Sequence, residues 1–240
     1  MMSKLNNNLL AVVAAGMLAV SGASGAVTFS DGGTGLQGLL DGHPNVGSGT
    51  VDVINDQMGD ASDSYWTFGG TNASINVILG ENTLNAASNA FGIFSGGTSI
   101  EIFNGTDGAG YKALVNYAAG NIGVTVFDEL GNFNRFSGLI AWSGSPFGFY
   151  LNNGSDTFFS DSTLNAGGID AMVGYQNVPK PGESILAFED GTLEGGVANT
   201  DYDDFVVMVE SVYPVPAPAT LALLGLGLIG MGYRARRRKA

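Results

Sequence analysis

The chain has 240 residues, a formal net charge of −13, 38 glycines and no cysteine. This length fits one β-rich domain of ordinary size with processing segments at its ends. The absence of cysteine excludes disulfides, thiolate catalysis and cysteine-ligated zinc, and a hydrophobic share of 45% is too high for a disordered protein.

The charge is unevenly distributed along the chain. All 22 acidic residues lie between residues 27 and 215, together with only three of the nine basic residues, so this body has a formal charge of −19. Such a body repels phosphate backbones, and we therefore expect no nucleic-acid partner. Divalent cations are the partners that its charge favours.

The N-terminus has the three parts of a secretory signal. Lys4 supplies the positive charge, the twelve residues from Leu9 to Val20 are apolar, and Ser24-Gly25-Ala26 is a small-residue cleavage site. We therefore predict a signal peptide over residues 1–26, cleavage after Ala26 and export of the body.

A glycine pattern follows the predicted signal peptide. Gly33, Gly35 and Gly38 have the GxGxxG spacing of a dinucleotide-binding loop, which requires a helix directly after it. The residues that follow contain Gly42 and Pro44, which are expected to prevent that helix. We therefore attribute the pattern to chance in a glycine-rich chain.

His43 is the only histidine, so any Ser-His-Asp mechanism would depend on it. It lies in Asp41-Gly42-His43-Pro44, which is a turn sequence and not an ordered strand end. No other catalytic set of residues stands out, so the expectation is a protein without enzymatic activity.

Short apolar or alternating segments separated by turn residues fill the rest of the body. Alternation with a period of two, as in SIEIF and NIGVTVF, is typical of half-buried antiparallel strands. Between the two ends we expect no long amphipathic helix. The predicted strands are 51–54, 65–68, 74–79, 91–95, 99–103, 112–117, 122–128, 138–142, 147–151, 170–175, 184–189 and 205–212. They indicate an all-β fold with a single β-sandwich or jelly-roll domain over residues 27–213.

Five aromatic residues have two interpretations. Trp66, Trp142, Phe147, Phe149 and Tyr150 could stack against sugars on one face of a sandwich, which would make the body a carbohydrate-binding module of the cell surface. The alternative is that they fill the core or pair across strands.

Acidic residues are concentrated in the last part of the body. Oxygen ligands on adjacent turns suit calcium, which takes six to eight oxygens in irregular geometry. Alternation along Asp201-Tyr202-Asp203 would place both carboxylates on one face. The alternative is a solvated acidic loop whose aspartates cap turns. The candidate calcium ligands are Glu189, Asp190, Asp201, Asp203 and Asp204.

The segment ILAFEDG is followed by an Asp-rich turn and a valine-rich strand. Through these features residues 147–212 resemble the domain of unknown function DUF4114. In this chain the turn has Asp203 where Asn is common. The family is β-rich and occurs in exported bacterial proteins, so the resemblance implies a fold and no activity. The matching positions are Phe188, Glu189, Asp190, Asp201, Tyr202, Asp203, Asp204 and Val206–Val209.

The C-terminus sets a prolyl segment, an apolar run and a basic cluster one after another. The 17 residues from Ala217 to Tyr233 carry no charge, and as a helix they would almost span a bilayer. Arg236, Arg237 and Arg238 belong to a basic cluster that the positive-inside rule keeps in the cytoplasm. We expect transient anchoring in the inner membrane.

The order of these three parts over residues 214–240 resembles the PEP-CTERM sorting signal of Gram-negative bacteria. Pro216-Ala217-Pro218 stands where that family has Pro-Glu-Pro. The resemblance implies processing by an exosortase, an integral-membrane enzyme found in species that make exopolysaccharide. Segments of this kind are also labelled after the C-terminus of ice-binding proteins. The expected function is that of a non-enzymatic envelope or extracellular-matrix protein associated with exopolysaccharide or biofilm.

Overall fold

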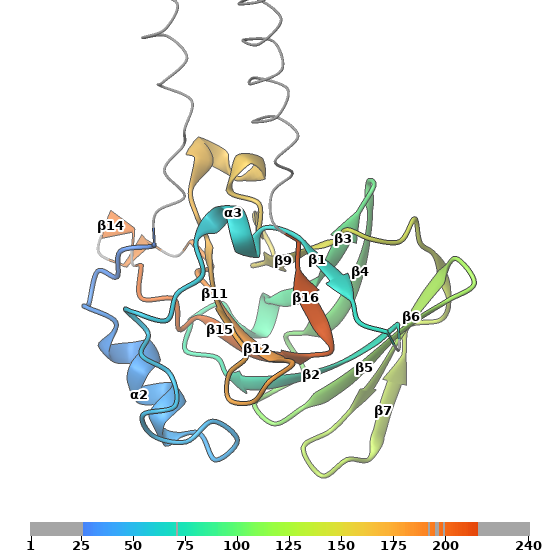
Figure 1. The fold of residues 1–240 in the computed structure, drawn as a ribbon, viewed down its shortest axis with the longest axis horizontal. Coiled ribbons are helices and arrows are strands. Elements are labelled where there is room, and N and C mark those ends of the chain that lie inside the picture. The colour runs from blue at the N-terminus through green and yellow to red at the C-terminus, as the bar shows by residue number, and fades with distance from the viewer. Residues whose placement is uncertain (1–25, 71, 192, 195–196, 199, 216–240) are drawn as a thin grey trace, which may run out of the picture.

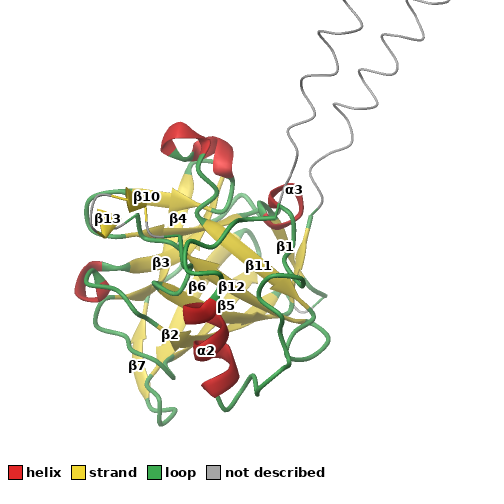
Figure 2. Ribbon diagram, turned by 90° about the vertical axis from the view of Figure 1, so that its left-hand side faces the viewer, coloured by secondary structure: helices red, strands yellow, loops and turns green. Residues whose placement is uncertain are grey.

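The structure is a computed structural model, and it describes residues 26–215 apart from 71, 192, 195, 196 and 199. Antiparallel strands dominate this part of the chain and helices are few (Figures 1 and 2), which confirms the all-β prediction. The predicted signal peptide and sorting helix lie in residues 1–25 and 216–240, outside the described residues.

The strands form two main sheets. One has four strands in the order β10-β9-β3-β4, and the other has eight, in the order β11-β12-β15-β2-β5-β6-β7 with β8 paired to β6. The first sheet consists of β3 (Ala90–Ser95), β4 (Thr98–Asn104), β9 (Gly148–Asn152) and β10 (Thr157–Phe159). The second consists of β2 (Ala73–Gly80), β5 (Lys112–Ala118), β6 (Asn121–Phe127), β7 (Phe133–Phe136), β8 (Ile140–Ala141), β11 (Met172–Gln176), β12 (Glu183–Phe188) and β15 (Phe205–Glu210).

Smaller elements complete the described chain. Strands β1 (Trp66–Phe68) and β16 (Val212–Pro214) pair with each other, as do β13 (Leu193–Glu194) and β14 (Val197–Ala198). The helices are α2 (Thr34–Gly42), α3 (Asp60–Asp63) and 3-10 turns at Ala86–Ser88, Ser162–Leu164 and Ala166–Gly168.

The two main sheets share one hydrophobic core, at the centre of which lies Phe91 of β3. Its ring centroid is 5.6 Å from that of Phe149 on the neighbouring strand and 5.2 Å from that of Phe205 on the opposite sheet. Phe188 of β12 contacts the same ring edge-on at 5.9 Å. All four side chains are buried, so this cluster joins the sheets across their interface.

A second core lies on the other face of the eight-stranded sheet, beneath α2. Leu36 and Leu40, four residues apart and hence on one face of the helix, are buried there against Ile185 and Ala187 of β12 and Val206 of β15. Figures 1 and 2 show α2 lying along this side of the sheet. Strands β12 and β15 are therefore covered on both faces, which explains their continuous apolar sequences.

The prediction that no helix forms after the glycine pattern was wrong. Helix α2 begins at Thr34 and contains both Gly35 and Gly38. The low helix propensity of glycine is overridden here by the burial of the leucine face. The carboxylate of Asp31 accepts hydrogen bonds from the backbone nitrogens of Gly33 and Gly35, both at 2.7 Å, and so caps the first turn.

One predicted strand was wrong, a second was right only in part, and some short strands were missed. Residues 51–54 form turns beneath α2, where Val51 and Val53 are buried in the second core. Of residues 138–142, only Ile140–Ala141 pair as a strand. The short strands β7 and β10 were missed because each has few residues and a weak apolar pattern.

Replacing Phe91 by alanine is expected to lower the free energy of unfolding by about 3–5 kcal/mol, because the cavity would lie between both sheets. The matched control is Phe133→Ala on β7, where the side chain is 66% exposed, and the expected change is within about 0.5 kcal/mol. Urea denaturation of both variants measures the difference. Similar losses in the two variants would contradict the position of the core.

Candidate metal centre

Three loops at one edge of the eight-stranded sheet supply the acidic residues. Strand β12 ends at Phe188, which pairs with Phe205 at the start of β15, and Val206 pairs with Gly80 at the end of β2. Because neighbouring antiparallel strands run in opposite directions, the end of β12, the start of β15 and the end of β2 meet at this edge. The acidic residues of these loops are Glu81, Glu189, Asp190, Asp201, Asp203 and Asp204.

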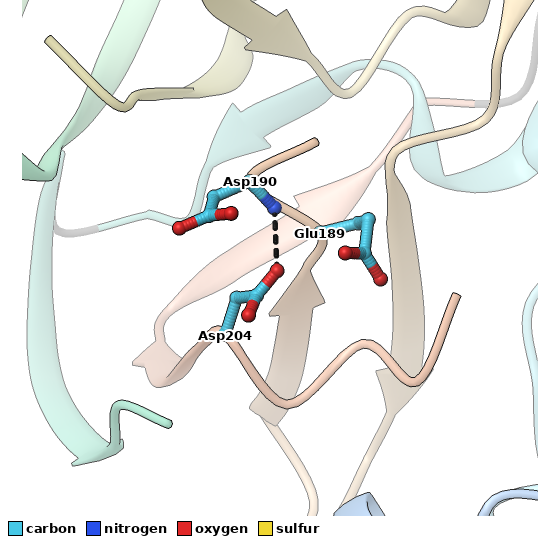
Figure 3. A group of neighbouring side chains, drawn as sticks. All are labelled: Glu189, Asp190 and Asp204. Carbon is cyan, nitrogen blue, oxygen red and sulfur yellow. Dashed lines mark hydrogen bonds between the residues drawn. The ribbon is translucent and has the colours of Figure 1, made fainter. Parts of the chain in front are cut away.

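The carboxylates form two groups of three that share Asp204. In the first, Glu189, Asp190 and Asp204 each offer one oxygen, and these oxygens lie within 4.8 Å of one another. In the second, Asp201, Asp203 and Asp204 do the same. Figure 3 shows the carboxylate of Asp204 between those of Asp190 and Glu189. All five predicted ligands are therefore brought together.

Most of these side chains are buried, and some of their oxygens lack a donor. Glu189 is 5% exposed and Asp203 is 4% exposed. The Oε1 atom of Glu189 and the Oδ1 atom of Asp203 are buried without a hydrogen-bond partner. Buried carboxylate oxygens in folded proteins almost always have a partner, so these two atoms point to a ligand of positive charge.

Hydrogen bonds hold the carboxylates in place. The backbone nitrogen of Asp190 donates to Oδ2 of Asp204 at 2.8 Å, and that of Tyr202 donates to Oε2 of Glu189 at 3.3 Å. The side-chain amide of Asn82 donates to Oδ2 of Asp203 at 3.0 Å. These contacts fix one oxygen of each carboxylate and orient the other.

Burial and mutual repulsion raise the pKa values of the cluster. Burial raises the pKa of Glu81 to about 7, with Asp190 and Asp204 acting in the same direction. Burial raises the pKa of Asp203 to about 6, and Asp201 adds to the effect. Burial raises the pKa values of both Glu189 and Asp204, and the two neighbouring carboxyl groups titrate as a pair.

No positive side chain in the described part of the chain balances this charge. The two ion pairs there join Arg135 to Asp107 and Lys180 to Glu183, and neither involves the cluster. Closely spaced, oriented carboxylate oxygens of irregular arrangement are the donor set that calcium prefers. The residues present thus fit a calcium ion.

The sequence prediction identified the residues of the Asp-rich turn, but the strand alternation on which it relied was wrong. Tyr202 has a φ of 55°, so residues 201–203 are not a strand with alternating side chains. The Tyr202 side chain is buried, and its hydroxyl donates to the backbone oxygen of Asp170 at 2.7 Å. This left-handed residue turns the chain so that Asp201, Asp203 and Asp204 converge.

Three residues near the cluster were missed. Glu81 and Asn82 directly follow β2, and only the pairing of β2 with β15 brings them to the site. Asp31, just before α2, is near Asp203. Gly35 in the first turn of α2 is also close to Asp203: a Cβ atom built on Gly35 would lie 2.6 Å from the Oδ2 atom of Asp203. The start of α2 therefore packs directly against the acidic loop, and Gly35 leaves the room for it.

The other candidate residues take different positions. Trp66, Trp142, Phe147 and Phe149 are between 0% and 4% exposed. For these four residues the interpretation as core side chains holds, and the sugar-stacking interpretation does not. His43 ends α2, and its Nδ1 accepts a hydrogen bond from the backbone nitrogen of Asn45 at 3.2 Å, as in a turn. The sorting residues Pro216, Pro218, Arg236, Arg237 and Arg238 lie outside the described residues.

The sequence model of the PEP-CTERM protein-sorting motif matches residues 214–238, which confirms that part of the sequence prediction. The motif implies an exported protein that an exosortase processes at the membrane. No curated protein and no solved structure matches the chain significantly. No helix among the described residues is long and apolar enough to cross a membrane. The apolar run at residues 217–233 lies outside the described residues.

In a chelator, the melting temperature is expected to rise as the pH falls from about 8 to about 5. The folded pKa values of Glu81 and Asp203 lie above the value of about 4 in the unfolded chain, so the folded state binds protons more tightly. Asp170, whose pKa burial raises to about 7, acts in the same direction. This stabilisation is complete below pH about 4 and is lost as the pH rises through about 7.

Glu81→Gln should reduce this pH dependence. The matched control is Asp128→Asn, because hydrogen bonds from Asn132 lower the pKa of Asp128 and its titration falls below this pH range. Thermal unfolding followed by circular dichroism measures both. A melting temperature that falls on acidification between about pH 8 and pH 5 would contradict the raised pKa values.

Proposed function

We propose that this protein is a non-enzymatic component of the cell envelope or extracellular matrix, that it is associated with exopolysaccharide, and that its body binds calcium. The observation that carries the proposal is the PEP-CTERM motif at residues 214–238 of an acidic β-rich body. The resemblance stated above places such signals in species that make exopolysaccharide. In this proposal, residues 1–26 direct export and residues 214–240 anchor the chain transiently in the inner membrane.

The calcium proposal is supported by the buried, unpartnered oxygens of Glu189 and Asp203 and by the two groups of carboxylates around Asp204. An exported protein meets calcium well above cytosolic levels, so a site with a dissociation constant of about 10⁻⁴ to 10⁻³ M would be occupied. The resemblance of residues 147–212 to DUF4114 is compatible with a sandwich of the two described sheets, and it stays a prediction.

The non-enzymatic part of the proposal depends on the absence of a catalytic pattern in the sequence. The Nδ1 atom of His43 accepts a hydrogen bond from the backbone nitrogen of Asn45 within its own turn, as a turn histidine does. The carboxylates of Glu189, Asp190 and Asp204 are buried and lie together, which suits a bound cation better than proton transfer to a substrate.

The alternative function is a carbohydrate-binding module. Its original support from two tryptophans is lost, because Trp66 and Trp142 are buried. Tyr150, the remaining aromatic candidate, is only partly buried and lies in a cleft on the outer face of the four-stranded sheet. That observation keeps the alternative open.

Mass spectrometry of protein recovered from the culture medium tests the export proposal. The intact mass should correspond to a chain that begins near Val27 and lacks the basic tail from Arg234 onward. In a strain without exosortase, the uncleaved form should accumulate in the membrane fraction. Full-length protein retained in the cytoplasm would contradict the export proposal.

Matrix association is tested by fractionation. The protein should sediment with the polysaccharide of the producing strain and remain in the soluble medium of a strain that makes none. The same distribution in both strains would contradict the association with exopolysaccharide.

Calcium is expected to stabilise the purified exported protein. At about 100 times the dissociation constant, the gain is about 2.7 kcal/mol, or an increase in melting temperature of about 5–10 °C for a chain of this size. The double variant Glu189→Gln, Asp203→Asn should lose this response, while its melting temperature in chelator rises because the repulsion is reduced. Identical curves in calcium and in chelator for the wild type would refute the site.

Two glycines of α2 supply a matched control for the geometry. A Cβ on Gly35 must displace the Asp203 carboxylate, whereas a Cβ on Gly38 meets no atom within 4 Å. Both substitutions by alanine should improve helix propensity by about 0.5–1 kcal/mol. Gly38→Ala is therefore expected to keep the calcium response, and Gly35→Ala to weaken it. Equal calcium responses would show that Asp203 takes no part.

A further inference from the structure

A polar cleft of about 390 Å³ lies on the outer face of the four-stranded sheet, away from the shared core. Its size falls within the range of about 300–1,000 Å³ that small-molecule sites occupy. Strands β3, β4, β9 and β10 all contribute to it. The lining includes Ala90, Glu101, Tyr150, Asn152, Thr157 and Phe159.

Strand register explains why the cleft is there. One row across the sheet reads Phe159, Tyr150, Gly92 and Glu101, and the next begins Thr157, Asn152 and Ala90. The central strand β3 thus contributes its smallest side chains to both rows. Larger residues on the strands to either side rise above Gly92 and Ala90 and form the walls.

The ring of Tyr150 lies across Gly92. A Cβ atom on Gly92 would be 2.7 Å from the Cε1 and Cζ atoms of that ring, so only glycine leaves room for it. The Tyr150 side chain crosses β3 towards Ser99 of β4, which also lines the cleft. Its close approach to Gly92 sets the ring against the sheet, so the ring forms a flat surface within the cleft.

The polar groups around this ring are also fixed. The amide nitrogen of Asn152 donates to the hydroxyl of Thr157 at 2.7 Å, and its oxygen accepts from the backbone nitrogen of Gly154 at 2.9 Å. Glu101 accepts a hydrogen bond from the side-chain amide of Asn104 at 3.0 Å. Preorganised polar groups lose little conformational entropy when a ligand binds.

We propose that this cleft binds an uncharged segment of polysaccharide, with a sugar ring against Tyr150 and its hydroxyl groups bonded to Asn152, Thr157 and Glu101. An aromatic face and a few oriented polar groups match the apolar face and the hydroxyl rim of a pyranose. Glu101 and the formal body charge of −19 disfavour acidic polysaccharides and nucleotides. The inference rests on the proposed association with exopolysaccharide and names the site and the class of sugar.

Calorimetric titration of the calcium-loaded exported protein with four neutral hexasaccharides, cellohexaose, laminarihexaose, maltohexaose and xylohexaose, tests this site. Neutral polysaccharide purified from the producing strain and oligogalacturonate complete the panel. We expect at least one neutral ligand to bind and oligogalacturonate not to bind. Tyr150→Ala should weaken binding about tenfold or more, as loss of an aromatic anchor does, and Tyr150→Phe should largely retain it.

Phe133→Ala is the matched control, since Phe133 is an exposed aromatic residue on a different sheet. It should leave the affinity unchanged. Melting curves of all variants establish that they are folded, and Asn152→Ala supplies a second test that leaves the aromatic ring intact. Failure of every neutral ligand to bind, binding of oligogalacturonate alone, or an affinity indifferent to both Tyr150→Ala and Asn152→Ala would overturn the proposal.

The proposed function and this site fail in different ways. If the protein sediments with polysaccharide in the Tyr150→Ala variant as in the wild type, the matrix association stands and the cleft is not its cause. If the wild type binds a neutral hexasaccharide in the cleft but does not sediment with the polysaccharide of the producing strain, the sugar site stands and the matrix association falls.

Discussion

Strands β12 and β15 are covered on both faces, and this double coverage determines much of the rest of the structure. On one face Phe188 and Phe205 join the aromatic cluster around Phe91. On the other face Ala187 and Val206 lie beneath α2. Strands buried in this way cannot shift in register without exposing apolar side chains to water.

The position of the acidic loops follows from that fixed register. One acidic loop begins where β12 ends and another leads into the start of β15. Their carboxylates are therefore held together by the packing of the strands and not by attraction among themselves. Repulsion between the carboxylates is a cost that the two cores offset, and it makes the charge state of this edge sensitive to protons and to cations. The pH and the cation concentration outside the cell therefore affect the stability of this part of the protein.

The two faces of the four-stranded sheet also have different roles, because the strand register determines which side chains lie on each face. Phe149 and Leu151 of β9 point into the shared core, while Tyr150 and Asn152, which alternate with them along the strand, line the outer cleft. Alternation along one strand therefore supplies both an anchor of the fold and a candidate ligand surface. The loop after β9 also reaches the acidic edge, where the side chain of Asn153 donates to the backbone oxygen of Asp190 at 2.8 Å.

Sequence alone determined the all-β class, most of the longer strands and the sorting motif, because period-two alternation and the order of proline, apolar and basic segments are local patterns. It also identified the acidic turn. It could not predict α2, because the leucines of that helix gain their stability from a sheet formed by distant residues. Nor could it separate Trp66 from Tyr150: which aromatic residue lies in the core and which lies on the surface depends on the pairing of whole strands. Only the tertiary structure brings Glu81 and Asn82 to the acidic edge, because they are more than a hundred residues away from Glu189 in the chain and adjacent to it through the neighbouring strands.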